Sequence, residues 1–295
     1  MGTYWRVRLA APPKLDLAAL RADIAERLAT IVEEMSHWAA DSLLSRFNTK
    51  PGGSWTALPL DFATVIAIGL TIAESSEGAF DPTIGRLTDL HGLGPNPAAS
   101  PPSSEAIEAA LAVSGWHRLA FDGSARQLRQ PGNLWLDLSG IAKGHAVDAV
   151  AALLGSKGLR HALVEIGGEC VGRGLRPDSE PWWVDLETPP GIALAPFRIA
   201  LHQFAVATSG NYVRGDHSLD PRTGQPIRNG IASVSVLHAS AMQADAWATA
   251  ITVLGRDDGA ALARREGLAA RIICITAGYV DEWISPALAQ MLDED

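Results

Sequence analysis

The chain opens with an alternating segment and then a long helical stripe. Residues 4–9, YWRVRL, alternate apolar and polar side chains, which predicts a strand. The next apolar positions recur at spacings of four, four, three and four, the period of an amphipathic helix: Leu20, Ile24, Leu28, Ile31 and Met35.

The same patterning predicts the remaining elements. The segment HRLAFDGSARQLRQ, residues 117–130, predicts a hairpin that turns at Asp122-Gly123. Helices are predicted over 60–76, 103–114, 141–155, 241–254, 257–266 and 285–292, the second capped by Ser103 or Ser104. Strands are predicted over 134–138, 160–166, 182–187, 197–201, 203–208, 231–237 and 271–276.

Helices and strands are interspersed without a steady β-α alternation. This order favours an α+β fold with mixed or antiparallel sheets and flanking helices. The Pro/Gly-rich stretches 92–102 and 174–195 are predicted to be loops inside the domain, because core-like segments continue on both sides. We therefore expect one domain over residues 1–295.

Composition narrows the classes of function. The formal charge of −9 argues against nucleic acid or an anionic membrane as a partner. Two cysteines give neither a disulfide framework nor a metal-thiolate spacing, and no apolar run is long enough to span a membrane. The first 16 residues lack the apolar core of a signal peptide. We expect a cytoplasmic protein, with a periplasmic protein whose leader was removed as the alternative.

Two opposite charges stand where a predicted strand meets a predicted helix. Asp137 and Lys143 lie in a run that is otherwise small or apolar, beside Gly140 and Gly144. One interpretation is an ion pair at the helix start, with Asp137 also capping free amides. The other is a ligand site, because a glycine-containing turn before a helix N-terminus suits a phosphate or a polar ring edge.

Another acid lies inside an apolar helical segment. In MQADAWATAITVLG, residues 242–255, Asp245 and Thr249 are four positions apart and project from one helix face. Their oxygens could serve as ligands of a hard cation such as Mg²⁺. The alternative is an acid in the first helical turn, favoured by the helix dipole.

Two further segments carry candidate chemistry. Residues 207–227 place His217, Asp220 and Arg222 near glycines and a proline, either as a polar hairpin loop or as a functional loop. The segment EGAFDPTIGRL, residues 77–87, predicts a turn when taken by itself.

Taken together and in order, these clusters resemble the ApbE family, the FAD:protein FMN transferases. The resemblance begins at Met1-Gly2-Thr3 and covers nearly the whole chain, with less to match after about residue 256. Its further motifs are SRFN (45–48), GAFDPTIG (78–85), DLSGIAKGHAVD (137–148), VEIGGE (164–169), ATSGNY (207–212), HSLDPRTGQPI (217–227) and DAWATA (245–250).

The resemblance implies an activity and a set of site residues. Family members use Mg²⁺ and move the FMN half of FAD onto a threonine hydroxyl of an acceptor protein, releasing AMP. The implied metal ligands are the side chains of Asp245 and Thr249 and the backbone oxygen of Gly140. The implied flavin contacts are Met1, Trp38, Ala79, Phe80, Asp81, Asp137, Lys143 and His217.

Several roles stay open at this point. His217 is one candidate general base because of its ordinary pKa, with Asp220 and Asp245 as rivals. Arg222 either clamps a phosphate or pairs with an acid, and Trp38 either stacks on a ring or packs in the core. The alternative functions are a Mg²⁺-dependent FAD pyrophosphatase giving FMN and AMP, and a non-catalytic flavin-binding protein. A nicotinamide oxidoreductase is disfavoured, because no G-x-G-x-x-G follows a strand.

Overall fold

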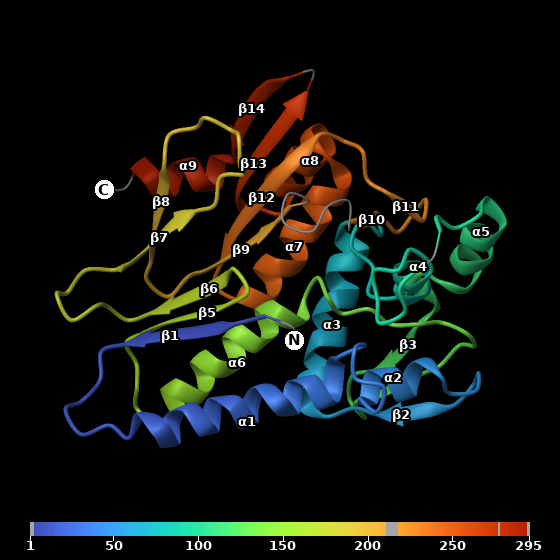
Figure 1. Ribbon diagram of the computed structural model, residues 1–295, viewed down its shortest axis with the longest axis horizontal. Helices are drawn as coiled ribbons and strands as arrows, with labels where there is room; N and C mark the ends of the chain where they lie inside the picture. The colour runs from blue at the N-terminus through green and yellow to red at the C-terminus, as the bar shows by residue number, and fades with distance from the viewer. Residues whose placement is uncertain (1–2, 99, 211–217, 277, 294–295) are drawn as a thin grey trace. The chain divides into compact units, whose positions relative to one another are not determined.

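The structure is a computed structural model that describes residues 3–98, 100–210, 218–276 and 278–293 (Figure 1). The chain forms two compact units, each assembled from separate stretches of sequence. Unit 1 comprises Met1–Ala29, Lys143–Gly215 and Arg228–Asp295, and unit 2 comprises Thr30–Ala142 and Asp216–Ile227. The expectation of one domain over 1–295 stays a prediction.

Unit 1 is organised around a large sheet. Among the described residues it has seven strands in the order β1-β5-β6-β9-β12-β13-β14, and every neighbouring pair is antiparallel. A separate antiparallel hairpin, β7–β8, belongs to the same unit. The strands are β1 (Trp5–Leu9), β5 (Ala162–Ile166), β6 (Glu169–Arg173), β7 (Trp182–Leu186), β8 (Phe197–Leu201), β9 (Ala205–Ser209), β12 (Ile231–His238), β13 (Ala269–Thr276) and β14 (Tyr279–Ile284).

Different elements cover the two faces of this sheet, as Figure 1 shows. On one face, Leu163, Cys170 and Leu237 form a core with the β7–β8 hairpin and with Leu288 of α9 (Pro286–Asp293). Helix α7 (Ala241–Leu254) packs against β9 and β12. Helices α6 (Ala142–Ser156) and α8 (Arg256–Arg265) also belong to this unit, as does α1 (Leu17–Met35) up to Ala29.

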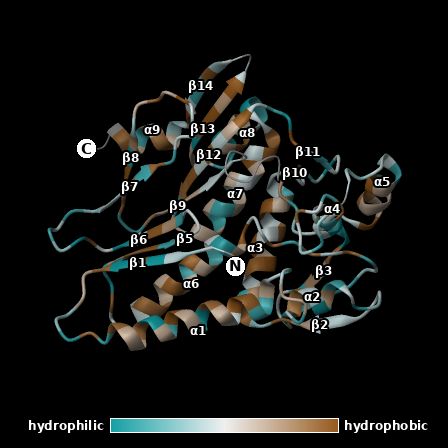
Figure 2. Ribbon diagram, in the orientation of Figure 1, coloured by the Kyte–Doolittle hydropathy of each residue, from teal (hydrophilic) through white to brown (hydrophobic). Residues whose placement is uncertain are grey.

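Strand composition follows position in the sheet. The edge strand β1 carries Arg6 and Arg8 and is teal in Figure 2, whereas the inner strand β13 is brown over most of its length. Residues Ala269–Cys274 of β13 are all buried. A strand buried on both faces loses the polar alternation that a half-exposed strand keeps.

The described residues of unit 2 form several helices and two small sheets. A three-stranded antiparallel sheet has the order β2-β4-β3, and β10 pairs with β11. The helices are α2 (Leu43–Asn48), α3 (Leu60–Ser75), α4 (Gly85–Leu90), α5 (Ser104–Val113) and the 3₁₀ turn η1 (Trp116–Arg118). The strands are β2 (Trp55–Ala57), β3 (Ala120–Asp122), β4 (Gln127–Arg129), β10 (Leu219–Asp220) and β11 (Gln225–Pro226).

The longest predicted stripe is confirmed. Helix α1 (Leu17–Met35) buries all five apolar positions of the stripe, each at 8% exposure or less. The Ser103 cap is also confirmed, because the Ser103 hydroxyl accepts a hydrogen bond from Ala106 N–H at 3.3 Å. The predicted hairpin over 117–130 forms as β3 and β4, which pair antiparallel.

The strand predicted over 134–138 is wrong. Only an isolated bridge between Trp135 and Ile84 is present there. The Asn48 side-chain amide donates to Leu136 O at 3.1 Å and accepts from Leu136 N–H at 2.7 Å. Gln130 likewise bonds the backbone N–H and C=O of Leu134. Side-chain amides therefore satisfy the backbone groups that a neighbouring strand would have paired.

No helix in the described stretches of the chain is both long enough and apolar enough to cross a membrane. The compartment stays a prediction.

Candidate active site

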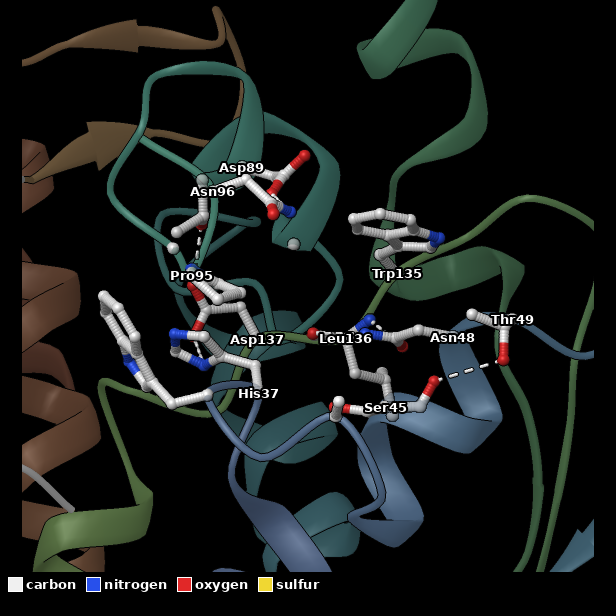
Figure 3. Close-up of a pocket in the computed structure, with 15 residues that line it drawn as sticks. His37, Ser45, Asn48, Thr49, Asp89, Pro95, Asn96, Trp135, Leu136 and Asp137 are labelled. Atoms are coloured by element: carbon white, nitrogen blue, oxygen red, sulfur yellow. Dashed lines mark hydrogen bonds and ion pairs between the residues drawn. The ribbon is translucent and has the colours of Figure 1, made fainter. Parts of the chain in front are cut away.

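Unit 2 contains a cavity of about 290 Å³ (Figure 3). Its wall is built from the segment after α1, from α2 and α4, and from the segment that precedes α6. The lining residues include His37, Trp38, Asn48, Thr88, Asp89, Asn96, Trp135 and Asp137. Two of these residues, Trp38 and Asp137, are flavin contacts implied by the family resemblance.

Three of the residues that line the cavity carry aromatic rings: His37, Trp38 and Trp135. Trp38 is 63% exposed, so the alternative of a core aromatic is wrong, and its ring lies 5.4 Å from that of His37. Figure 3 shows His37 and Trp135 apart, with Leu136 and Asp137 between them. The Arg86 guanidinium lies 4.2 Å from the centre of the Trp135 ring. The exposed indole of Trp38 on the cavity wall suits a flat, apolar ring.

Asp137 is a buried carboxylate with several partners. Its Oδ2 accepts from the Thr88 hydroxyl at 2.6 Å, and its Oδ1 accepts from Ser139 N–H at 2.8 Å. His37 Nδ1 lies 3.6 Å from Oδ1. Asp137 therefore caps the turn that leads into α6, as one sequence interpretation expected, while it also lines the cavity.

The GAFD segment, residues 78–81, is buried. Ala79 is 1% exposed and Phe80 is 4% exposed. Asp81 accepts from Thr83 N–H and from the Thr83 hydroxyl at Oδ1, and from Trp116 N–H at Oδ2. Burial raises the pKa of Asp81, and these hydrogen bonds oppose the rise. The carboxylate thus holds two loops together, and the flavin contacts of all three residues stay predictions.

Unit 1 contains a cluster of buried charges, which we call the acid–lysine cluster: Lys143, Glu169 and Asp245. Lys143 stands in the first turn of α6, and its ammonium forms an ion pair with Glu169 Oε1. The same ammonium lies 3.7 Å from Asp245 Oδ1. Asp245 Oδ2 accepts from Gly144 N–H at 3.0 Å. The interpretation of Lys143 as a partner for Asp137 is therefore replaced by a pairing with two other acids.

Burial dominates the electrostatics of this cluster. The Glu169 side chain is 2% exposed and the Asp245 side chain 7% exposed. Burial raises the pKa of Glu169 to about 7, against the opposing effect of Lys143. Burial also raises the pKa of Asp245, with Lys143 and Gly144 N–H opposing the rise. One ammonium placed between two buried carboxylates makes the cluster a favourable place for an additional positive charge.

Helix packing explains the glycine next to Lys143. A Cβ on Gly144 would lie 2.2 Å from Ala241 O and 2.7 Å from Met242 Cα. Gly144 is therefore needed for the close approach of α6 and α7, a different reason from the open ligand turn that the sequence suggested. Asp245 lies beyond the first turn of α7, which begins at Ala241, so the simple dipole interpretation is wrong.

The donors for a cation are few. In the described parts of the chain, no three His, Cys, Asp or Glu side chains gather in a geometry that could hold a metal ion. The Thr249 hydroxyl donates to Asp245 O at 3.1 Å, one turn along α7. Gly140 lies in the turn that precedes α6, within unit 2. Mg²⁺ commonly binds to one or two carboxylates and completes its shell with water and substrate phosphate, and the oxygens of Asp245 and Thr249 within unit 1 are of the type that it prefers.

Four residues remain among those that the sequence marks as possible site residues, and the structure describes two of them, Asp220 and Arg222. Met1 and His217 lie outside the described residues. Arg222 pairs with Asp220 through Nε and Nη2, each at 2.9 Å, so the acid-pairing alternative is the observed one. Asp220 also accepts from Arg222 N–H at 2.9 Å.

The sequence interpretation assigned no role to several residues of these two sites. Glu169 is the last residue of the VEIGGE motif, and an acid that opens a strand after two glycines is a usable signal. His37 and Trp135 line the cavity because of non-local packing, for which the local sequence carries no signal.

The family of this chain follows from its similarity to known proteins. The model of the ApbE family matches residues 1–272. The chain belongs to the ApbE family. It is 34% identical to the FAD:protein FMN transferase of Vibrio cholerae, across 100% of this chain and 91% of that protein. It is 33% identical to the FAD:protein FMN transferase of Klebsiella pneumoniae, across 99% of this chain and 87% of that protein.

Solved structures of the ApbE family share the fold. The flavin transferase ApbE from Vibrio cholerae superposes with a TM-score of 0.92 at 34% identity, covering 98% of this chain and 96% of that chain. The apo flavinyl transferase ApbE of Pseudomonas stutzeri gives a TM-score of 0.90 at 34% identity, covering 97% and 92%. The predicted α+β fold with antiparallel sheets and flanking helices is confirmed.

Proposed function

We propose that this chain is an FAD:protein FMN transferase that moves FMN from FAD to a threonine hydroxyl of an acceptor protein and releases AMP. The observation that carries the proposal is its full-length similarity to proteins of that name, at 32–34% identity in the first five relatives. The acid–lysine cluster and the aromatic cavity are compatible with this activity.

The reaction needs a charged, water-poor site. The threonine oxygen attacks the FMN phosphorus, the bond from that phosphorus to the bridging oxygen breaks, and AMP leaves with the bridging oxygen. The hydroxyl proton passes to a base. Negative charge grows on the phosphate oxygens during this exchange, so positive charge placed beside them lowers the barrier.

The proposed metal ligands are Asp245 and Thr249 by side chain and Gly140 by its backbone oxygen. Mg²⁺ bound there would neutralise phosphate charge and align the reacting groups. The support is a buried Asp245 carboxylate that shares a single ammonium with Glu169. Lys143 would supply a second positive charge toward the pyrophosphate.

The proposed flavin contacts are those that the resemblance implied: Met1, Trp38, Ala79, Phe80, Asp81, Asp137, Lys143 and His217. For Trp38 the support is an indole exposed on the cavity wall, and for Asp137 it is a place in the same wall. Ala79, Phe80 and Asp81 are buried, so we propose that they act through the backbone or by shaping the loop. His217 remains the proposed base, because the rival Asp220 is held in an ion pair with Arg222.

The test is FMN transfer measured by mass spectrometry of an acceptor protein, incubated with FAD and Mg²⁺. We expect the acceptor to gain the mass of FMN with the parent enzyme. Asp245→Asn should lower the rate by at least about 10²-fold, because the carboxylate charge is lost while the side-chain shape is kept.

Asp258→Ala is the matched control, since Asp258 is an exposed acid on the neighbouring helix α8. Its rate should equal that of the parent. Unchanged transfer by a folded Asp245→Asn variant would remove the metal assignment, and a missing FMN adduct with the parent would remove the function.

A further inference from the structure

Glu169 stands at a place in the sheet that points it into the helical side of unit 1. It opens β6 directly after Gly167 and Gly168, whose φ angles are +63° and +105°. Its neighbour Cys170 packs into the core shared with β7–β8 and α9. Because successive strand residues point to opposite faces, Glu169 faces away from that core.

The acid–lysine cluster has two buried carboxylates around Lys143. Glu169 Oε1 forms the direct ion pair, whereas Asp245 Oδ1 is 3.7 Å from the ammonium, beyond hydrogen-bond range. Glu169 Oε2 is buried and has no hydrogen-bond partner among the described residues. The shorter contact of Lys143 is thus with Glu169. The other oxygen of Asp245, Oδ2, accepts a hydrogen bond from Gly144 N–H.

The Lys143 ammonium and a divalent cation would otherwise compete for the Asp245 carboxylate, and this geometry gives the ammonium a different acid, Glu169. We propose that Glu169 is a positioning residue that retains the Lys143 ammonium and so leaves Asp245 Oδ1 able to bind a divalent cation. The inference rests on the metal site named under the proposed function. Without the Glu169 charge, Asp245 is the remaining acid in the cluster, and the ammonium would pair with it and repel the incoming cation.

A purely structural role would predict a different arrangement. A buried ion pair kept for stability needs its remaining polar atoms satisfied, because each unpaired one costs free energy. The Glu169 carboxylate instead keeps one oxygen unpartnered within the described structure, and it lies beside a second acid that is not its partner. An unpartnered carboxylate oxygen beside a second buried acid favours a cluster that takes up a further cation.

The experiment measures metal binding directly, with neither FAD nor acceptor present. Mn²⁺ accepts the same oxygen ligands as Mg²⁺ and is counted by electron paramagnetic resonance. Glu169→Gln should bind Mn²⁺ roughly 10-fold more weakly than the parent, as residues supporting a metal ligand typically do when changed. Glu165→Gln is the matched control, because Glu165 pairs with Cys170 across β5 and β6 and lies on the opposite face. Its Mn²⁺ affinity should equal that of the parent.

A second variant tests whether Glu169 acts through Lys143. Lys143→Met should bind Mn²⁺ at least as tightly as the parent, and adding Glu169→Gln to it should change the affinity little. Circular dichroism and melting curves restrict the comparison to folded protein. Parent-like affinity in Glu169→Gln, an equal loss in both backgrounds, or no Mn²⁺ binding by the parent would each overturn the inference. Failure of FMN transfer alone would leave it standing.

Discussion

At the scale of single residues, a buried carboxylate can hold specific pieces of backbone in place. Asp81 illustrates this, with three hydrogen bonds from Thr83 and Trp116 at 2.6–3.0 Å. All three groups donate hydrogen bonds to the Asp81 carboxylate. An ionised carboxylate can only accept hydrogen bonds. A neutral amide at this position would present its NH₂ group to one of these donors.

We therefore predict that Asp81→Asn lowers the free energy of unfolding by about 1–3 kcal/mol, the cost of leaving a buried donor unpaired. Asp122 offers a matched control, since it accepts from Ser124 N–H, the Ser124 hydroxyl and Ala125 N–H in an exposed turn. Asp122→Asn should cost less, because all three donors bond one oxygen, Oδ1, which an amide oxygen replaces, and the turn is open to water. Urea unfolding of both variants provides the measurement, and equal losses would contradict the argument.

At the scale of elements, the regular periods of the sequence were sufficient for the long helices and for many strands. The helix predicted over 241–254 and the strand predicted over 197–201 match α7 and β8 at both ends. Short elements such as α2 and α4 were missed, because six residues show too little of the helical period. The error at 134–138 has another cause, since the partners of Leu136 are side-chain atoms of Asn48, 88 residues away.

The candidate site was predictable to a similar extent. DLSGIAKG and DAWATA marked Lys143 and Asp245 as separate motifs, and the structure brings these two side chains together. The third member, Glu169, joins through an ion pair across 26 residues, which no local pattern contains. The order of the motifs was enough to identify the family. The ion pairs of Lys143 could be found only from the way that α6, α7 and β6 pack together.

The contact between α6 and α7 gives a prediction at this scale. Gly144→Ala should lower the free energy of unfolding by about 1–3 kcal/mol, because its methyl group would overlap the backbone of Ala241 and Met242. Gly155→Ala on the same helix is the control, since no atom lies within 4 Å of the added Cβ. That change should be neutral or stabilise by up to about 1 kcal/mol. Thermal melts compare the two, and equal destabilisation would contradict the packing argument.

At the scale of the whole molecule, the proposed site residues divide between the two units. Trp38, Asp81 and Asp137 belong to unit 2, whereas Lys143 and Asp245 belong to unit 1. The motif over 137–148 itself crosses from one unit to the other at Lys143. The family activity is thus assigned to residues of both units, and a test of function needs the full chain.

The transferase and pyrophosphatase activities differ in the fate of FMN. For each AMP released, a transferase leaves one FMN on the acceptor, and a pyrophosphatase leaves one FMN free.

We predict that AMP release by the full chain with FAD and Mg²⁺ depends on the acceptor and equals the acceptor-bound FMN. Replacing the acceptor threonine with valine, which keeps the shape and removes the nucleophilic hydroxyl, should stop both signals together. Chromatography of AMP and FMN beside mass spectrometry of the acceptor measures this balance. AMP release that continues at the same rate with the valine acceptor, accompanied by free FMN, would show that water is the acceptor and would replace the transferase proposal with hydrolysis.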